Sequence, residues 1–209
     1  MTNYLHKEHI VLGDESRMQE TIDGWWRHVN AVVYRRHQEL FTGCLCDIGC
    51  NIGMMTLLAA TDPRVECVLG LDVQPAALAA ACRYRDFLHL QSKVEYRVVD
   101  FTKPCPEIAD ASFDCVMSFH TLEHILVADL VPFLANVHRI LKPDGVVFVS
   151  IPYKTAHNSP EHESWFDENS LRNLFTQNGF ESVVIEVDDG AILTGIFKKE
   201  KHSEPPVLS

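Results

Sequence analysis

The sequence predicts an α/β fold, in which a doubly wound sheet of seven strands is mostly parallel and ends with an antiparallel hairpin strand. Two observations carry this prediction. Short apolar runs alternate with helical patterns along most of the chain, which is typical of parallel strands joined by helical crossovers on both faces of a sheet. The last two apolar runs differ, because only the turn-forming segment Asp188-Asp189-Gly190 separates them. One of these two strands must therefore oppose the others.

The individual elements follow from apolar periodicity and from residues that start or stop helices. Apolar runs and period-two patterns predict strands at residues 44–48, 65–73, 94–99, 113–119, 146–151, 180–187 and 191–197. Helical spacing predicts helices at residues 19–41, 53–60, 76–88, 126–141 and 168–178. Pro75 suits the first turn of a helix, and Asp167 suits an N-cap. Pro143-Asp144-Gly145 suits a turn before the fifth strand.

The composition limits the class of protein. The chain has 209 residues, which suits one domain with short flanks. Its 18 Lys and Arg against 29 Asp and Glu give a net charge of −11, which disfavours nucleic acid as a partner because phosphate binding needs clustered basic residues. No apolar stretch is long enough to span a bilayer, and residues 1–15 lack the apolar core of a signal peptide. The seven cysteines, an odd number without a CxxC pair, predict reduced thiols and a cytoplasmic location.

Polar segments follow the first three predicted strands, where a doubly wound sheet binds its ligands. The first is the glycine-rich turn Cys46-Asp47-Ile48-Gly49-Cys50-Asn51-Ile52-Gly53, whose glycines let the backbone turn sharply and approach a ligand. The second is Asp72, 19 residues past Gly53, at the spacing of a carboxylate that binds a ribose hydroxyl. The third is Asp100-Phe101, where a carboxylate can accept from an amine and a ring can stack on a base. A plain tight turn, and helix capping by Asp47, remain the alternatives.

These segments, together with Phe113-Asp114-Cys115-Val116-Met117-Ser118 and Leu141-Lys142-Pro143-Asp144-Gly145, resemble class I methyltransferases that depend on S-adenosylmethionine (SAM). The resemblance covers roughly residues 40–198, includes the antiparallel terminal strand, and is to the small-molecule type, similar to O-methyltransferases of the ubiquinone pathway. It implies a Rossmann-like fold, with SAM as cofactor and S-adenosylhomocysteine as product. It also implies a helical lid or cap at residues 1–42, a SAM-binding methyltransferase domain at 43–198 and a flexible polar tail at 199–209.

The resemblance also implies which residues bind the cofactor. The glycine turn would hold the methionine part of SAM, Asp72 the ribose and Asp100-Phe101 the adenine, above a floor of Ser118 and Phe119. The turn departs from the commonest family motif at Asn51, which replaces a glycine, although Asn tolerates a left-handed backbone better than most residues. A nicotinamide-dependent enzyme would need GxGxxG spacing, which this turn lacks. The implied cofactor-binding residues are Asp47, Gly49, Cys50, Asn51, Gly53, Asp72, Val73, Asp100, Phe101, Ser118 and Phe119.

The segment His120-Thr121-Leu122-Glu123-His124 follows the fourth strand and supplies the predicted catalytic residues His124, His120 and Glu123. Methyl transfer from a sulfonium depends mainly on positioning, but a hydroxyl or amine acceptor needs a base. The spacing is also similar to the metal-binding Glu-x-x-Glu-His of ubiquinone-pathway and small-RNA methyltransferases, with His120 in place of the first Glu. A later histidine, His157 or His162, would complete such a set. Catalysis, metal binding and helix capping stay open here, and no metal is assigned.

Two further regions are predicted to contact the acceptor. The loop after the fifth strand carries Tyr153, His157 and His162, at a strand end where this family places substrate contacts. A merely solvated loop is the alternative. Trp25, at the start of the chain's helical segment, would belong to a lid over the cofactor, with core packing as the alternative.

The sequence thus predicts an enzyme, a SAM-dependent methyltransferase that acts on O or N of a small molecule as a monomer or homodimer. One alternative is a SAM-binding regulatory or partner subunit without transferase activity. Another is an RNA-end methyltransferase, which the net charge of −11 disfavours.

Overall fold

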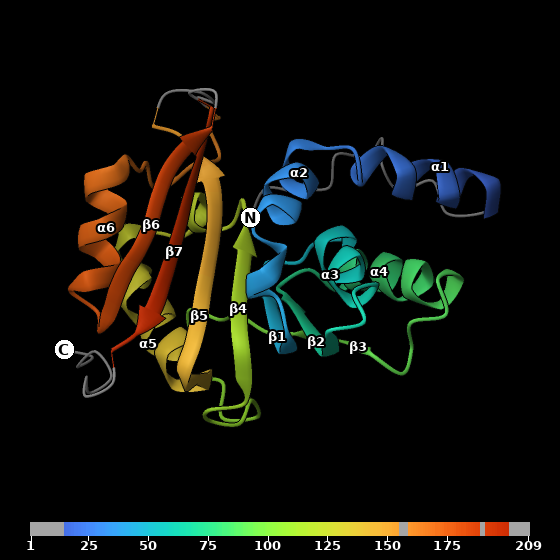
Figure 1. Ribbon diagram of the computed structural model, residues 1–209, viewed down its shortest axis with the longest axis horizontal. Coiled ribbons are helices and arrows are strands. Elements are labelled where there is room, and N and C mark those ends of the chain that lie inside the picture. The colour runs from blue at the N-terminus through green and yellow to red at the C-terminus, as the bar shows by residue number, and fades with distance from the viewer. Residues whose placement is uncertain (1–14, 155–158, 189–190, 201–209) are drawn as a thin grey trace.

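A computed structural model describes residues 15–154, 159–188 and 191–200, which fold around a seven-stranded sheet in the order β3-β2-β1-β4-β5-β7-β6 (Figure 1). The strands are β1 (Gly43–Ile48), β2 (Val65–Asp72), β3 (Val94–Val98), β4 (Phe113–Phe119), β5 (Leu141–Pro152), β6 (Phe180–Asp188) and β7 (Ile192–Lys199). The α-helices are α1 (Glu15–Trp25), α2 (Val29–Arg36), α3 (Met54–Ala60), α4 (Pro75–Phe87), α5 (Leu130–Ile140) and α6 (Glu168–Thr176). Short 3₁₀ turns form η1 (Gln38–Leu40), η2 (Leu122–His124) and η3 (Val127–Asp129).

The strand pairing confirms the predicted topology. Parallel pairs join β3, β2, β1, β4 and β5 in that order. β7 pairs antiparallel with both β5 and β6, as the short connection between the last two strands requires. Because β1 to β4 run in the same direction, their carboxyl ends meet at one edge of the sheet. This is the edge where ligands bind in doubly wound folds.

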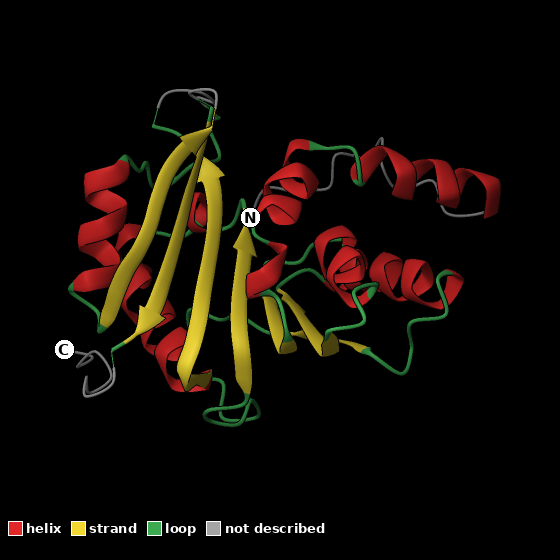
Figure 2. Ribbon diagram, in the orientation of Figure 1, coloured by secondary structure: helices red, strands yellow, loops and turns green. Residues whose placement is uncertain are grey.

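Two hydrophobic cores, one on each face of the sheet, explain the almost wholly apolar strands. Successive strand residues point to opposite faces, so Cys46 and Ile48 of β1 belong to one core and Leu45 belongs to the other. The first core packs α5 and α6 against the sheet, and the second packs α2, α3 and α4 (Figure 2). Burial on both faces is typical of parallel sheets.

The helices differ from the prediction at two places. The sequence predicts one helix over residues 19–41, but the chain breaks there into α1, α2 and η1. His28 has an extended backbone, and its Nδ1 accepts a hydrogen bond from the N–H of Asn30 at 3.4 Å, so it caps α2 and starts a second helix. The helix predicted over residues 126–141 begins only at Leu130, after η3. Within the described ranges, no helix is long and apolar enough to cross a membrane.

The predicted turn Pro143-Asp144-Gly145 lies inside β5, which begins at Leu141. The pairing register between β4 and β5 shifts between Phe113 and Cys115, so the turn-forming residues produce an irregularity within the strand instead of ending it. At the terminal hairpin, Asp188 pairs with Ile192, and residues 189–190 of the predicted turn lie outside the described residues.

One pair of cysteines is disulfide-bonded, and the prediction of reduced thiols is wrong for that pair. Cys44 on β1 and Cys67 on β2 are direct partners in the parallel register, with their Cα atoms 4.7 Å apart, and the structure joins their sulfurs. Neighbouring strands therefore bring together two residues that are 23 positions apart in the chain. The other five cysteines are free thiols.

The packing of Tyr96 on Gly70 generates a stability prediction. A Cβ at Gly70, in the middle of β2, would lie 2.5 Å from Cδ1 of the partly buried Tyr96 ring. Gly70→Ala should therefore lower the free energy of unfolding by about 1–3 kcal/mol, the usual cost of overpacking a core. Urea denaturation measures it. Gly24→Ala is the matched control, because nothing lies within 4 Å of a Cβ there, and stability should stay equal or rise. Equal stability of the Gly70→Ala variant and the wild type would contradict the packing described.

Candidate functional site

The glycine turn after β1 has the backbone that the sequence predicts. Gly49, Asn51 and Gly53 all have left-handed φ angles, of 74°, 50° and 79°. The N–H groups of Gly49 and Cys50 both donate to the Leu71 carbonyl on the neighbouring strand, at 2.8 and 3.0 Å. Asn51 thus adopts the conformation that glycine has in the commonest motif, and the turn leads directly into α3.

Asp72 joins the glycine turn to the end of β2. One carboxylate oxygen accepts from the N–H of Asn51 at 2.8 Å, and the other accepts from the N–H of Gln74 at 2.9 Å. Asp72 is only 9% exposed, and this burial raises the pKa of its carboxyl group. Each oxygen can accept a second hydrogen bond, so the carboxylate can receive hydroxyl groups from a ligand at this edge.

Asp47 lies below the turn and is almost completely buried. Its Oδ2 accepts from the hydroxyl of Thr56 on α3 at 2.5 Å. Burial, the largest cause, and the nearby Asp72 charge raise the pKa of Asp47 to about 7. The sequence analysis did not single out Thr56, although its place in the first turn of the helix after the glycine motif is a usable signal. The helix-capping alternative for Asp47 is not what the structure has, since no side-chain cap is made at Gly53.

Thr121 approaches the turn from the β4 side. Its hydroxyl donates to the Ile48 carbonyl at 3.1 Å. A Cβ at Gly49 would lie 2.6 Å from the Thr121 methyl group, so only glycine fits there. This close approach also escaped the sequence analysis, because it depends on how β1 and β4 pair.

The end of β3 differs from the prediction in one respect. Asp100 is exposed, and its Oδ1 accepts from the backbone N–H and the hydroxyl of Thr102 at 3.1 and 2.6 Å. Phe101, however, is 4% exposed and packs edge-on against Phe133 of α5, with ring centroids 5.5 Å apart. Its ring belongs to the core and is not placed to stack on a base. The apolar side chain that the structure leaves open after β2 is Val73, at 58% exposure.

Ser118 and Phe119 end β4 and are both buried. Phe119 packs against Phe148 of β5, with ring centroids 5.3 Å apart. The hydroxyl of Ser118 has no hydrogen-bond partner among the described residues. A buried polar group without a partner is uncommon, so this hydroxyl marks a place where a ligand can supply the missing hydrogen bond.

His120 and Glu123 lie just past β4. His120 has a left-handed φ of 53°, which is uncommon for a residue with a side chain. Its Nε2 lies 3.0 Å from Oδ1 of Asn30 on α2, and its Nδ1 lies 3.3 Å from Oε1 of Glu123. Glu123 is 3% exposed, and neither carboxylate oxygen has a hydrogen bond among the described residues. Asn30 is a further residue that the sequence pattern did not reveal.

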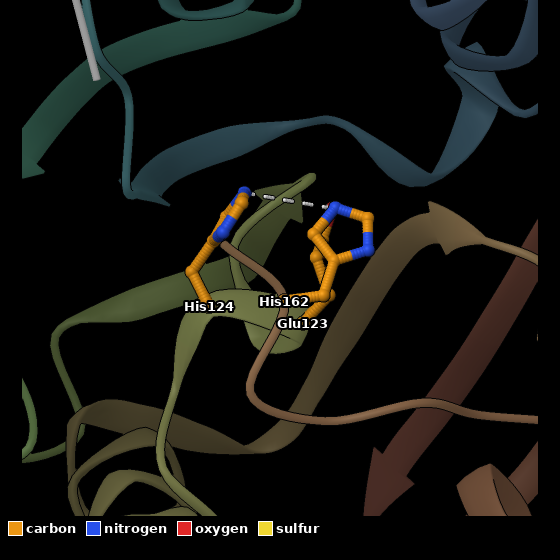
Figure 3. A group of neighbouring side chains, drawn as sticks. All are labelled: Glu123, His124 and His162. Atoms are coloured by element: carbon orange, nitrogen blue, oxygen red, sulfur yellow. Dashed lines mark ion pairs between the residues drawn. The ribbon is translucent and has the colours of Figure 1, made fainter. Parts of the chain in front are cut away.

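His124 and His162 complete this group with Glu123 (Figure 3). Nδ1 of His124 lies 3.1 Å from the Glu161 carbonyl, so in the neutral ring Nδ1 carries the proton and Nε2 is the acceptor. That Nε2 lies 4.0 Å from Oε1 of Glu123. The ring of His162 stands edge-on to His124, with centroids 5.1 Å apart. One ligand atom from each of the three residues lies within 4.8 Å of the others, a donor set that suits a divalent ion.

The loop that carries His162 is fixed by backbone hydrogen bonds. The N–H groups of Glu163 and Ser164 both donate to the Glu123 carbonyl, at 2.7 and 3.1 Å. Segments 37 or more positions apart in the chain therefore meet at η2, which is why spacing alone left His157 and His162 as equal candidates. His157 lies outside the described residues.

The remaining predicted acceptor contacts are more peripheral. The hydroxyl of Tyr153 donates to the Glu168 carboxylate of α6 at 3.1 Å. Trp25 ends α1 beside His28, with ring centroids 5.3 Å apart. The half-buried rings of Trp25 and Trp26 pack against the core that α2, α3 and α4 share.

Comparison with known proteins identifies the family. The sequence matches the family described as "Methyltransferase domain" over residues 46–149, the part that holds the glycine turn, Asp72 and the end of β4. The chain belongs to the class I SAM-dependent methyltransferases. A probable SAM-dependent methyltransferase of Mycolicibacterium smegmatis is 29% identical over 169 residues, which cover 76% of this chain and 60% of that protein. The human mitochondrial ubiquinone biosynthesis O-methyltransferase is 30% identical over 116 residues. These residues cover 53% of this chain and 29% of the human protein.

Solved structures share the fold. A SAM-dependent methyltransferase from Aquifex aeolicus superposes with a TM-score of 0.69 at 17% identity, over 90% of this chain and 99% of that one. The S-adenosylhomocysteine complex of DhpI gives a TM-score of 0.69 at 17% identity, over 89% and 93% of the two chains. The [4+2]-cyclase SpnF also has a TM-score of 0.69, at 16% identity over 87% and 82%. The architecture is therefore shared by enzymes of different chemistry.

The carboxyl edge of the sheet fits SAM, the cofactor of this family. The left-handed turn at Gly49 leaves backbone without side chains, the Asp72 carboxylate can receive hydroxyls, and Ser118 offers an unpartnered buried hydroxyl. SAM supplies an electrophilic methyl group on a sulfonium whose departure leaves a neutral thioether. The predicted ribose contact at Asp72 and the predicted floor at Ser118 and Phe119 stay predictions.

The raised pKa of Asp47 generates a prediction about pH. The pKa is near 3.8 in the unfolded chain and about 7 in the folded protein, so the folded protein binds the proton more tightly between these values. Stability contributed by this group should therefore fall as pH rises from about 4 to about 7, by up to about 4 kcal/mol. The measurement is urea unfolding of the wild type and Asp47→Asn across this range. The difference between the two should change with pH in that window and level off above it, whereas parallel profiles would contradict the burial of Asp47.

Proposed function

We propose that this methyltransferase moves the methyl group of SAM to an oxygen or nitrogen atom of a small molecule. The observation that carries the proposal is the group of His120, Glu123 and His124, which lies past β4 at the edge that also bears the glycine turn. An acceptor held there would face both the cofactor side and a base. Proton-accepting and carboxylate groups in this position favour a transferase over a chain that only binds SAM.

In this proposal, His124 is the base. The Glu161 carbonyl holds the proton on Nδ1, which leaves Nε2 to take the proton of an acceptor hydroxyl or ammonium group. The buried carboxylate of Glu123, whose Oε1 lies 4.0 Å from that Nε2, stabilises the imidazolium ion that forms. The leaving group of the transfer is neutral, so correct placement of the acceptor and exclusion of water supply most of the remaining rate.

The relatives support a small-molecule acceptor without naming it. Two ubiquinone biosynthesis O-methyltransferases match 53% and 50% of this chain, at 30% and 34% identity. The N-terminal helices would act as a lid, with Trp25 beside the acceptor and Tyr153 and His162 on the other side. A cytoplasmic location, and a monomeric or homodimeric state, stay predictions of the sequence.

Two other functions have some support. A Haloferax volcanii methyltransferase whose fold is similar, with a TM-score of 0.68, was solved in a complex with the activator Trm112, which suits a chain that needs a partner. An rRNA N6-adenosine methyltransferase of Caenorhabditis elegans is 34% identical over 34% of this chain. The net charge of −11 disfavours an RNA substrate unless a partner supplies basic residues.

The proposal is tested by calorimetric titration with SAM, followed by a methyl-release assay on a panel of hydroxyl and amine acceptors. The wild type should bind SAM and turn over at least one acceptor class. Asp72→Ala should weaken SAM binding by about 1–3 kcal/mol, because a charged acceptor of hydrogen bonds is lost. The SAM affinity of Asp100→Ala, which removes the carboxylate after β3, is compared with that of Asp72→Ala. Tight SAM binding without turnover of any acceptor would favour the partner-subunit function instead.

As an alternative use of the same side chains, we propose that Glu123, His124 and His162 bind a divalent ion near the acceptor, in which case Nε2 of His124 is a metal ligand and not the base. The support is that one ligand atom from each of the three residues lies within 4.8 Å of the others, and that the Glu123 carboxylate is buried without a hydrogen bond among the described residues. The bound ion would orient an acceptor oxygen and lower its pKa.

Metal analysis of protein purified without a His tag tests the ion. We expect about one equivalent of a divalent metal per chain in the wild type and a large loss in His162→Ala, since two of three ligands bind metals weakly. The exposed His89 lies away from the site, so His89→Asn should keep the metal. Absence of bound ion, with methyl transfer unaffected by a chelator, would refute the metal site and leave His124 as the base.

A further inference from the structure

The helix α2 lies on the side of the sheet toward which the arrowhead of β4 points (Figure 1). The segment before it is held by Trp26, whose indole N–H donates to the Met54 carbonyl of α3 at 3.4 Å. Just past its end, Nε2 of His37 lies 2.9 Å from the Glu186 carboxylate of β6. Both ends of α2 are therefore fixed to the main domain, on opposite sides of β4. These two contacts fix the position of α2, and of its side chains, relative to the residues 120–124 that follow β4.

Asn30 is the side chain of α2 that reaches those residues. It is 6% exposed, and its carboxamide oxygen lies 3.0 Å from Nε2 of His120. A buried carboxamide is retained only where it is hydrogen-bonded. The other nitrogen of the His120 ring, Nδ1, lies 3.3 Å from Oε1 of Glu123. The imidazole ring of His120 therefore lies between the Asn30 side chain of α2, which contacts Nε2, and the buried Glu123 carboxylate, which lies near Nδ1.

These two contacts distinguish His120 from His124, the other histidine after β4. Both nitrogens of His120 are engaged within the protein, whereas His124 uses Nδ1 for a backbone carbonyl and presents Nε2 toward Glu123. The nearest nitrogen to the Glu123 carboxylate belongs to His120, at 3.3 Å against 4.0 Å for His124. Of the two histidines, His120 thus lies closer to the carboxylate, and Asn30 is the α2 side chain that contacts His120.

We propose that Asn30 is a positioning residue of the reacting centre, which acts from α2 through His120 to hold the Glu123 carboxylate toward His124. Its kinetic consequence rests on the proposed function, because it assumes that His124 and Glu123 serve methyl transfer. The contact itself does not depend on that function. The N-terminal helices are then part of the reacting centre, and removal of one hydrogen bond in α2 changes the geometry at the end of β4.

The test compares Asn30→Leu, which has a similar volume but no hydrogen-bonding group, with Asn30→Asp, which keeps an oxygen acceptor. Asn178→Leu is the matched control, since Asn178 is another buried Asn, 8% exposed, whose amide donates to the Leu174 carbonyl at 2.7 Å, away from β4. The first readout is the side-chain ¹H–¹⁵N spectrum of histidine-labelled protein, with the His120 signals assigned by their loss in His120→Gln. This readout needs no acceptor.

We expect Asn30→Leu to shift the Nε2 signal of His120, Asn30→Asp to keep a hydrogen-bonded signal, and Asn178→Leu to leave it unchanged. If the leucine variant does not fold, Asn30→Ala takes its place. Once an acceptor is known, kcat should fall about tenfold in Asn30→Leu, an effect typical of small misplacement of reacting groups, while the affinity for SAM stays within about twofold. Asn30→Asp should recover part of the loss.

Two results would overturn the inference. One is a His120 spectrum that is the same in Asn30→Leu and the wild type, or that changes equally in Asn178→Leu. The other is an unchanged kcat in Asn30→Leu despite altered His120 signals, which would make the contact purely structural. A wild type that binds SAM but transfers no methyl group contradicts the proposed function instead, and the spectra then decide the Asn30 contact alone.

Discussion

The carboxylate of Asp72 ties the glycine turn to the end of β2, and the geometry of the cofactor edge depends on this tie. Backbone N–H groups of Asn51 and Gln74 converge on its two oxygens, while the Leu71 carbonyl beside it accepts from Gly49 and Cys50. These hydrogen bonds hold the turn in its left-handed conformation, which costs free energy for the Asn residue. They also set the direction of α3, whose Thr56 reaches back to the buried Asp47. One side chain thereby fixes two strand ends and one helix.

The features that depend on local chain chemistry were predictable from the sequence. Strand order along the chain, the terminal hairpin and the place of Asp72 follow from periodicity, turn chemistry and spacing, and Asn51 keeps the turn as its backbone preference suggests. The N-cap at Asp167 is also confirmed, with its side chain accepting from the N–H of Ser170 at 2.8 Å. Apart from the spacing of 19 residues between Gly53 and Asp72, each of these signals lies within a few residues of the feature that it predicts.

The features that depend on contacts between distant segments were not predictable. Apolar spacing continues across His28, so the helix break there shows only in the structure. The Asn30–His120 contact joins residues 90 positions apart, and no short motif records it. Phe101 is a related case. An alternation continued from Val94, Tyr96 and Val98 would place Phe101 on the opposite face from Val94. In the structure Val98 is exposed while Val99 and Phe101 are buried, so the pattern shifts by one residue at the end of β3.

The buried carboxylate of Glu123 is the least explained group in terms of stability. When ionised, a carboxylate that is 3% exposed and has no hydrogen bond among the described residues costs free energy, and its imidazole neighbours offset that cost only when they carry protons or share a cation. A hydrophobic residue of similar size would make a more stable core at η2. A buried carboxylate beside two histidines is therefore better explained by a role in the proposed chemistry than by a contribution to folding.

The distribution of these features shows where the specificity of this methyltransferase must lie. The sheet and its glycine turn are shared in fold with enzymes as different as a methyltransferase and a cyclase, so they define the cofactor edge and not the reaction. In the proposed function, the groups that would face an acceptor come instead from α2, from η2 and from the loop that carries His162, three segments that meet only in the folded chain. Each of them is held by hydrogen bonds to the residues after β4. If the proposed function holds, a change of acceptor would require changes in these three segments together, because each contacts the same buried carboxylate or its immediate neighbours.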